Sequence, residues 1–585
     1  MSNEKENMLD ELIKRFNEES LQKDIDRRSF LSGASKVAGA SLAVAIAQSM
    51  GGFTVEAAPQ FKDYPFTLGV ASGDPLSDSV VLWTRLAPDP LNGGGMPSHG
   101  VVPVKWEMAL DEHFRKIVKR GVEHAHPSLA HSVHAEVFGL KPNTVYYYRF
   151  KVGNELSPIG KTKTLPAKGA SVESLTFAFA SCQQYEHGYY TAYQHMAKEE
   201  LDLVFHLGDY IYEYGADEYV ASTGNVRQHK GEEIITLTDY RNRHAQYRSD
   251  EHLKEAHAAF PWIVTWDDHE VENNYANVIP EKGQSVEAFI KRRAAAYQAY
   301  YEHMPLRKSS LPHDSSMQLY RDFKYGDLAS FFVLDSRQYR DDQANDDGSK
   351  PHSPESLDPS RTLLGEEQEK WLLDHMEKST SKWNVLAQQV FFTERNFGTA
   401  ASPVYSMDSW DGYPAARQRI TDFATDKDMD NMIVLTGDVH ASWAANIKED
   451  YSNPESKTLG AEFVGTSITS GGDGSDVRAD TEKVLAENPH IEFFNNYRGY
   501  VRCRVTPDQW RADYRVVPFV SSKGADITTR ASFVYERDGK GLREISVNTV
   551  PEGIQKSTEI EEDRHKAHKR AHERQMRKKR GKVKN

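Results

Sequence analysis

Residues 207–212, Leu-Gly-Asp-Tyr-Ile-Tyr, directly follow the apolar run Leu-Val-Phe at residues 203–205. The run predicts a buried strand, and Gly208 predicts a turn at the strand's carboxyl end. Asp209 and Tyr212 would then point beyond that end. A carboxylate and a phenolate so spaced can bind one hard trivalent ion, and the carboxylate can also bridge to a second metal. Because a Gly-Asp pair alone is typical of an ordinary turn, the interpretation depends on the rest of the chain.

Two more polar clusters of this kind come later in the chain. Trp-Asp-Asp-His-Glu at residues 266–270 and Leu-Thr-Gly-Asp-Val-His at residues 435–440 each follow or end an apolar run. Cys182 follows another strand-like run, at residues 175–181. Strands that alternate with helices form layered folds in which ligands gather at the strand ends. Together these clusters indicate a metal-dependent phosphoester hydrolase.

The pattern of the chain changes near residue 170. Before it, short strands bounded by Gly, Pro and Asp predict an N-terminal all-β domain at residues 63–165. The stretch Leu-Lys-Pro-Asn-Thr-Val-Tyr-Tyr-Tyr at residues 140–148 is similar to the tyrosine corner of a fibronectin-like sandwich. The strands expected in this domain are residues 66–70, 79–84, 104–108 and 145–151.

After residue 172, strands alternate with helices, which predicts a layered α/β (α+β) sandwich as a second domain at residues 172–547. Ser285 is the expected N-cap of a long helix. The expected helices are residues 190–199, 237–248, 251–259, 285–302 and 366–377. The expected strands are residues 204–207, 262–266, 331–334, 383–386 and 432–435, with more β-structure from residue 463 onward.

The composition limits the classes of protein that need to be considered. In 585 residues, 38% are hydrophobic, which is enough for real cores. The formal charge of −14 argues against nucleic acid as a binding partner of the body of the protein. With two cysteines, Cys182 and Cys503, a disulfide-stapled scaffold is excluded, although one bridge between them stays possible.

Both ends of the chain carry signals of their own. Asp-Arg-Arg-Ser-Phe-Leu at residues 26–31, a short apolar run and a small-residue cleavage site predict a twin-arginine signal peptide at residues 1–57. The apolar run is too short and too polar for a membrane helix. Residues 548–585 form a basic tail, in which residues 564–585 hold eleven Lys and Arg against Glu573. The tail could be a solvated helix, a binder of anionic polymer, or a lid over the site.

Phosphoester cleavage at two metals needs a hydroxide nucleophile, a clamp for two phosphate oxygens and stabilisation of the leaving alkoxide. We expect the first metal to bind Cys182, Asp209, Tyr212 and His440, because the thiolate and the phenolate favour ferric iron. The second metal would share Asp209 and add Asp268 and Asp438, an oxygen-rich set that suits calcium or manganese better than zinc. His269 is then free to polarise the phosphate or protonate the leaving group.

The order of these motifs resembles the PhoD family of alkaline phosphatases, which belong to the calcineurin-like, purple-acid-phosphatase-like metallophosphoesterases. The likeness covers nearly the whole chain, as in the secreted Bacillus-type members. It includes the twin-arginine leader and Phe-Thr-Leu-Gly-Val-Ala-Ser-Gly-Asp at residues 66–74. The chain departs from the wider superfamily at residues 181–182, 267–270 and 437–440, where each change removes nitrogen or adds oxygen or sulfur ligands, so a di-zinc centre is not expected.

The resemblance implies a metallophosphoesterase sandwich and a phosphodiesterase and phosphomonoesterase with one ferric ion and two calcium ions. By motif, iron would bind the first set of four residues, and the nearer calcium Asp209, Asp268 and Asp438. Asn273 and Asn274 are candidates for the remaining calcium or for phosphate. Arg337 and Arg248 are candidates for contacts with substrate phosphate, with structural ion pairs as the alternative.

The leading hypothesis is therefore a secreted, monomeric hydrolase that uses metal-activated hydroxide on wall teichoic acid or other extracellular phosphate esters. It would meet the twin-arginine translocase during export, would not insert into a membrane, and would end outside the cell or at the cell wall. One alternative is a serine-nucleophile phosphatase, for which Ser181 is the only strand-end candidate. The other is a non-catalytic wall-binding protein whose sandwich and basic tail bind the wall.

Overall fold

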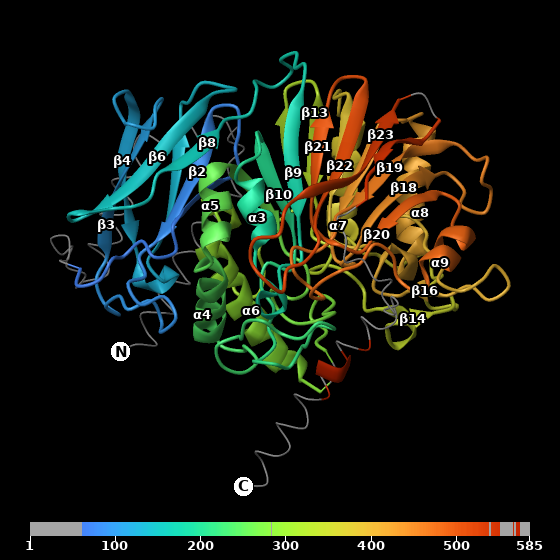
Figure 1. Ribbon diagram of the computed structural model, residues 1–585, viewed down its shortest axis with the longest axis horizontal. Helices are drawn as coiled ribbons and strands as arrows, with labels where there is room; N and C mark the ends of the chain where they lie inside the picture. The colour runs from blue at the N-terminus through green and yellow to red at the C-terminus, as the bar shows by residue number, and fades with distance from the viewer. Residues whose placement is uncertain are drawn as a thin grey trace, which may run out of the picture. The chain divides into compact units, whose positions relative to one another are not determined.

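The computed structural model describes residues 61–281, 283–537 and 540–549, with residues 566, 569–571 and 573 of the tail. The predicted signal peptide lies outside these residues, as does most of the tail. Residues 172–547 build two mixed sheets that pack face to face (Figure 1). Apolar side chains from both sheets, such as Phe177, Phe331 and Ile433, form the core between them. The predicted layered arrangement of strands and helices is therefore present.

The first sheet has ten strands in the order β24-β23-β22-β21-β9-β10-β11-β1-β2-β5. Its central strands β9 (Leu175–Ala180), β10 (Leu203–Leu207) and β11 (Pro261–Thr265) run parallel. Because they are parallel, their carboxyl ends lie at one edge of the sheet. The remaining C-terminal strands are β21 (Arg498–Val505), β22 (Gln509–Val517), β23 (Thr528–Glu536) and β24 (Leu542–Val547).

The second sheet has seven strands in the order β12-β13-β15-β17-β19-β18-β20. In it β13, β15, β17 and β19 run parallel. The bounds are β12 (Arg321–Tyr325), β13 (Ala329–Val333), β15 (Trp383–Ala387), β17 (Met432–Thr436), β18 (Ser442–Lys448), β19 (Thr458–Val464) and β20 (Ile491–Asn495). The short strands β14 (Ser349–Lys350) and β16 (Tyr405–Ser406) pair separately.

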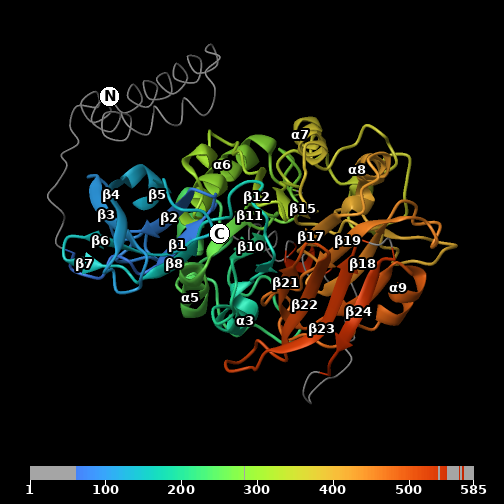
Figure 2. The same cartoon turned by 90° about the horizontal axis from the view of Figure 1, so that it is seen from above.

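Helices cover the outer face of each sheet. An aromatic-rich core packs α3 (Thr191–Met196), α4 (Leu237–Arg248), α5 (Glu251–Ala259) and α6 (Val286–His303) on the ten-stranded sheet. A second core packs α7 (Glu366–Glu377) and α8 (Pro414–Asp426) on the seven-stranded sheet (Figure 2). The small helix α9 (Thr481–Glu487) precedes β20. No described helix combines the length and the apolar character needed to cross a membrane.

The N-terminal strands do not form a sheet pair of their own. Strands β3 (Val102–Ala109), β4 (Ile117–Ala125), β6 (Val145–Val152), β7 (Glu155–Leu156) and β8 (Gly160–Lys163) make a five-stranded sheet. However, β1 (Val70–Gly73), β2 (Ser79–Arg85) and β5 (Ser132–Phe138) extend the ten-stranded sheet, since β1 pairs in parallel with β11. Apolar side chains of β1, β2 and β5 pack against those of β3 and β6, so the N-terminal strands form two layers, one of which continues into the ten-stranded sheet. The fibronectin-like character stays a prediction.

Gly73 shows why β1 can lie so close to its neighbours. A Cβ atom there would lie 2.6 Å from the carbonyl oxygens of Trp262 and Pro305. Real Cβ atoms do not approach backbone atoms so closely, so only glycine allows this packing. The tight approach brings the N-terminal strands into the catalytic sheet.

Most predicted elements are confirmed, and the exceptions have local causes. The bounds of α4, α5 and α7 agree with the prediction, and Ser285 caps α6 by accepting a hydrogen bond from the Ala288 amide at 3.2 Å. The strand expected at residues 66–70 is wrong, because Gly69 has φ +72° and β1 begins at Val70. Cys182 and Cys503 are both buried free thiols, so the possible bridge is not formed.

Candidate metal centre

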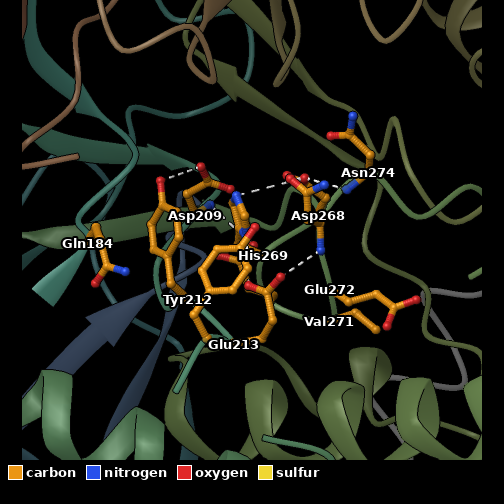
Figure 3. A network of polar contacts seen from close by, with 12 residues as sticks. Gln184, Asp209, Tyr212, Glu213, Asp268, His269, Val271, Glu272 and Asn274 are labelled. Carbon is orange, nitrogen blue, oxygen red and sulfur yellow. Dashed lines mark hydrogen bonds and ion pairs between the residues drawn. The ribbon is translucent and has the colours of Figure 1, made fainter. Parts of the chain in front are cut away.

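The candidate site lies where the parallel strands of both sheets end. Cys182 follows β9, the loop with Asp209 and Tyr212 follows β10, the loop with Asp268 and His269 follows β11, and the loop with His440 follows β17. Gly208 makes the turn after β10 possible: its φ is +107°, and a Cβ there would lie 2.4 Å from Cβ of Asp267. Figure 3 shows Asp209, Tyr212, Asp268 and His269 around one space.

The first predicted ligand set converges on one point. Ligand atoms of Cys182, Asp209 and His440 lie within 4.8 Å of one another, and all three residues are buried. The Tyr212 hydroxyl donates to Asp209 Oδ2 at 2.7 Å and lies 3.2 Å from His440 Nε2. The structure therefore brings together all four residues that the sequence assigned to the first metal.

The second group differs from the expected one in one member. Ligand atoms of Asp209, Asp268 and His269 lie within 4.8 Å of one another. Asp438 is not part of that group, although its charge raises the pKa of both Asp209 and Cys182. Asp209 thus belongs to both groups, as expected of a bridging ligand, and His269 lies close enough to bind a metal as well as substrate.

The electrostatics of these groups fit a cation. Burial raises the pKa of Asp209 well above its usual value, and the neighbouring carboxylates of Asp268 and Glu270 raise it further. Burial and the Asp209 charge likewise raise the pKa of the Cys182 thiol and of the Tyr212 phenol. A bound cation would lower the pKa values of these three groups, because it favours their ionised forms.

The buried carboxylate oxygens support the same conclusion. Oδ1 of Asp209 and Oδ1 of Asp268 are inaccessible to solvent and have no hydrogen-bond partner among the described residues. Buried polar atoms are normally paired, and a metal ion is one of the partners that can satisfy them. The chemistry of the donor set and these two oxygens both fit metal binding.

A carboxylate that the sequence did not single out orients His269. Glu213 is buried, and its Oε2 lies 2.7 Å from His269 Nδ1. The imidazole also stacks on Tyr212 with ring centroids 4.1 Å apart. Although burial lowers the pKa of His269, the carboxylates of Glu213, Asp268 and Asp209 together hold it well above its usual value. The ring is therefore fixed with Nε2 directed toward Asp268, whose Oδ2 lies 4.0 Å away.

The backbone at the site is strained. Cys182, Asp209, Asp438 and His440 have φ values of +58°, +55°, +59° and +53°. Non-glycine residues rarely adopt this left-handed region, at a cost of roughly 1–2 kcal/mol each. Such strain clusters at functional sites, where the surrounding structure enforces it.

Arg337 does not face an open substrate pocket. Its guanidinium is fully buried and forms ion pairs with Asp267 at 2.5 Å and Asp408 at 2.7 Å, and it lies 3.6 Å from Asp268 Oδ1. These ion pairs are the structural alternative that the sequence left open, and a contact of Arg337 with substrate phosphate stays a prediction. Arg337 holds the 267–268 turn in place, and Asp408 was not foreseen.

Arg248 also lies away from the predicted ligands. Its hydrogen bond goes to the Tyr210 hydroxyl, and its guanidinium lies over the Trp83 ring. It forms no ion pair within the described part of the chain, and its contact with substrate phosphate stays a prediction.

The two asparagines take different positions. The backbone amide of Asn274 donates to Asp268 Oδ2 at 2.8 Å, and its side-chain amide donates to Asp347 Oδ2 at 2.6 Å. The backbone amide of Asn273 donates to Glu213 Oε1 at 2.8 Å. Asn274 is thus the better placed of the two for a further cation beside Asp268, whereas Asn273 helps to hold Glu213.

One described residue of the basic tail reaches the site. Ala571 is fully buried in a cluster with Tyr212, Tyr214 and Tyr219. Tyr212 is a predicted metal ligand, so this part of the tail packs directly behind the first ligand set. The contact is consistent with the tail covering the site.

Comparison with known proteins gives matches over nearly the whole chain. The family model described as PhoD-like phosphatase matches residues 177–514, and that described as PhoD-like phosphatase, N-terminal domain, matches residues 53–166. Alkaline phosphatase D of Bacillus subtilis (strain 168) is 70% identical over 577 residues, covering 98% of this chain and 99% of that protein. A solved structure of PhoD matches with a TM-score of 0.89 at 73% identity, covering 89% of this chain and 100% of that chain.

Proposed function

Because the chain belongs to the PhoD-like phosphatase family, we propose that it hydrolyses phosphate monoesters and diesters at the strand-end centre described above. The observation that carries the proposal is the convergence of Cys182, Asp209 and His440, with Asp209 shared by a second group that includes Asp268. Shared carboxylates of this kind are typical of two-metal phosphoester hydrolases.

We assign Cys182, Asp209, Tyr212 and His440 to one ferric ion. Asp209, Asp268 and Asp438 would hold a calcium ion, with Asn274 beside a second calcium. The thiolate and the phenolate support iron in the first position, and the oxygen-rich second set supports calcium. When bound, these metals would supply Lewis acidity at the phosphate and lower the pKa of water.

The chain's own groups would bind the substrate and move the proton. His269 presents Nε2 toward the centre while Nδ1 is bonded to Glu213, so the protonated ring can donate to the leaving oxygen. Glu213 holds the ring in that orientation. Arg337 fixes the 267–268 turn through Asp267, which keeps the Asp268 carboxylate in position.

We further propose that the enzyme is exported by the twin-arginine pathway and acts at or outside the cell wall. Folded export lets the metals be loaded before release. A polyanionic diester such as wall teichoic acid suits a basic tail that has one residue packed against Tyr212. The serine-nucleophile alternative is not supported, because Ser181 is buried and its Oγ accepts a hydrogen bond from the Cys182 thiol at 3.2 Å.

The test combines elemental analysis with activity on chromogenic aryl monoesters and diesters. The exported enzyme should contain iron and calcium, and Asp209→Asn should lose both metals and nearly all activity. Asp358→Asn, at an exposed position remote from the centre, is the matched control and should keep both. An Asp209→Asn variant with full metal content and activity would refute the proposed centre.

A further inference from the structure

Arg248 is the last residue of α4, and its side chain ends in the protein interior. Its Nη1 lies 3.4 Å from the Tyr210 hydroxyl, and its Cζ lies 4.5 Å from the centre of the Trp83 ring. Nε and Nη2 are inaccessible to solvent and have no hydrogen-bond partner among the described residues. No described carboxylate forms an ion pair with this guanidinium, unlike Arg292, Arg337 and Arg417.

The groups that the Arg248 guanidinium contacts directly, the Tyr210 hydroxyl and the Trp83 ring, are neutral, and the nearby Asp250 is paired with Arg227. The Tyr210 hydroxyl lies 2.9 Å from His257 Nε2, and His257 Nδ1 is buried without a partner. Burial, with the charge of Arg248, holds the pKa of His257 well below its usual value, so this ring is uncharged at neutral pH. Lys254 is close enough that the charge of Arg248 lowers its pKa, after the larger effect of burial.

A buried cation without a counter-ion is costly, and arginine cannot avoid the cost by losing its proton. The contact with the Trp83 ring offsets only part of it. The usual solution in proteins is a carboxylate, which none of the described neighbours provides. The complementary partner is therefore a small anion that fits within the core.

We propose that Arg248 binds a monovalent inorganic anion of the halide class, chloride under ordinary conditions, through Nε and Nη2 of its guanidinium. The site lies between the N-terminal strands and α4–α5. It connects to the metal centre through Tyr210, whose hydroxyl contacts Arg248 and whose amide donates to Glu270 Oε1 at 2.5 Å. An anion bound to Arg248 would stabilise the loop that holds Asp209, through Tyr210. This effect does not depend on the proposed catalytic function.

The direct test is a crystal of the metal-loaded enzyme grown with sodium bromide in place of chloride. We expect an anomalous bromide peak in contact with Nε or Nη2 of Arg248. Water density without an anomalous signal at that position would overturn the proposal. This measurement uses the unmutated protein, so it does not depend on any variant folding, and it has no activity readout.

The second test follows thermal unfolding while chloride replaces gluconate at constant ionic strength. Chloride should raise the melting temperature of the unmutated enzyme by about 2–3 °C, because the anion binds the native state alone. Arg248→Met should lose this rise. Arg321→Met is the matched control: Arg321 pairs with Asp74 at 2.7 Å, so its loss should lower stability but keep the chloride effect. An equal chloride effect in Arg248→Met and in the unmutated enzyme would count against the site.

Discussion

Replacing Glu213 by glutamine tests whether this carboxylate positions the catalytic imidazole. Both oxygens of Glu213 are in use: Oε2 lies 2.7 Å from His269 Nδ1, and Oε1 accepts from the Asn273 amide at 2.8 Å. A glutamine has one acceptor oxygen, so one of the two bonds must be lost. Hydrogen bonds to a charged group contribute about 1.5–3 kcal/mol. If the lost hydrogen bond is needed to hold the His269 ring in position in the transition state, kcat should fall about 10- to 100-fold.

The assay is steady-state hydrolysis of an aryl diester, with metal content measured on the same samples. We expect kcat to fall, KM to change little, and iron and calcium to stay bound. His269→Ala should lower kcat by roughly 100- to 10,000-fold, the range for loss of a general acid. In that background Glu213→Gln should have almost no further effect, because its target is gone.

Two outcomes would refute the positioning role of Glu213. One is a full additional loss when Glu213→Gln is combined with His269→Ala. The other is loss of metal from the single variant, which would make Glu213 part of the metal binding instead. Glu302→Gln serves as the control for removal of a buried carboxylate, since Glu302 pairs with Arg241 away from the site, and it should keep kcat.

The remaining predictions concern single residues. Cys182→Ala should lower iron affinity by more than about tenfold and remove any visible charge-transfer band from Tyr212; an unchanged spectrum and iron content would contradict the assignment. Asp268→Asn should shift the calcium titration of activity about tenfold while iron stays bound, and equal sensitivity of both metals would argue against separate sites. Glu186→Gln should flatten the pH dependence of stability: burial raises the pKa of Glu186 to about 7 from 4.5, so the folded state holds a proton that the unfolded chain has released. The stability that this proton gives is lost as pH rises from about 4.5 through 7, by about 3 kcal/mol in total, and urea unfolding with the same pH profile in the variant would disprove this.

The strand-end ligands could be predicted because each follows an apolar run with its own local signal. Cys182 and Asp209 follow β9 and β10, which are short, apolar and parallel neighbours in one sheet, so their loops must meet at the same edge. His440 follows β17 of the other sheet, so its approach to them depends on how the two sheets pack. Helices α4 and α5 carry local end signals, because Thr236 and Asp250 cap their first turns, whereas α5 and α7 carry apolar residues along one face.

The residues that the sequence could not assign act through partners remote in the chain. Glu213 is next to Tyr212, but its role depends on His269, which is 56 residues away. For Arg337 the sequence left phosphate contact and a structural ion pair as alternatives, and its partner Asp408, 71 residues away, could not be named. The N-terminal strands gave no sign that three of them would join the catalytic sheet, because pairing of β1 with β11 depends on the shape of both surfaces. Such pairings are decided by packing, for which one sequence carries no local signal.

At the left-handed positions of the site, the residue type that the backbone conformation favours differs from the residue type that metal binding needs. Aspartate and histidine tolerate positive φ better than most residues, but the cysteine at 182 has no such tolerance, and glycine would fit each position at lower cost. Four such residues cost several kcal/mol, a large share of the 5–15 kcal/mol that stabilises an ordinary domain. The well-packed cores on both faces of the sheet hold these turns, since Ala180 and Leu207, the last residues of β9 and β10, are buried in them. A chain that keeps ligating side chains where glycine would relieve strain must recover that energy elsewhere, and the cations that we assign to these residues are partners that could supply it.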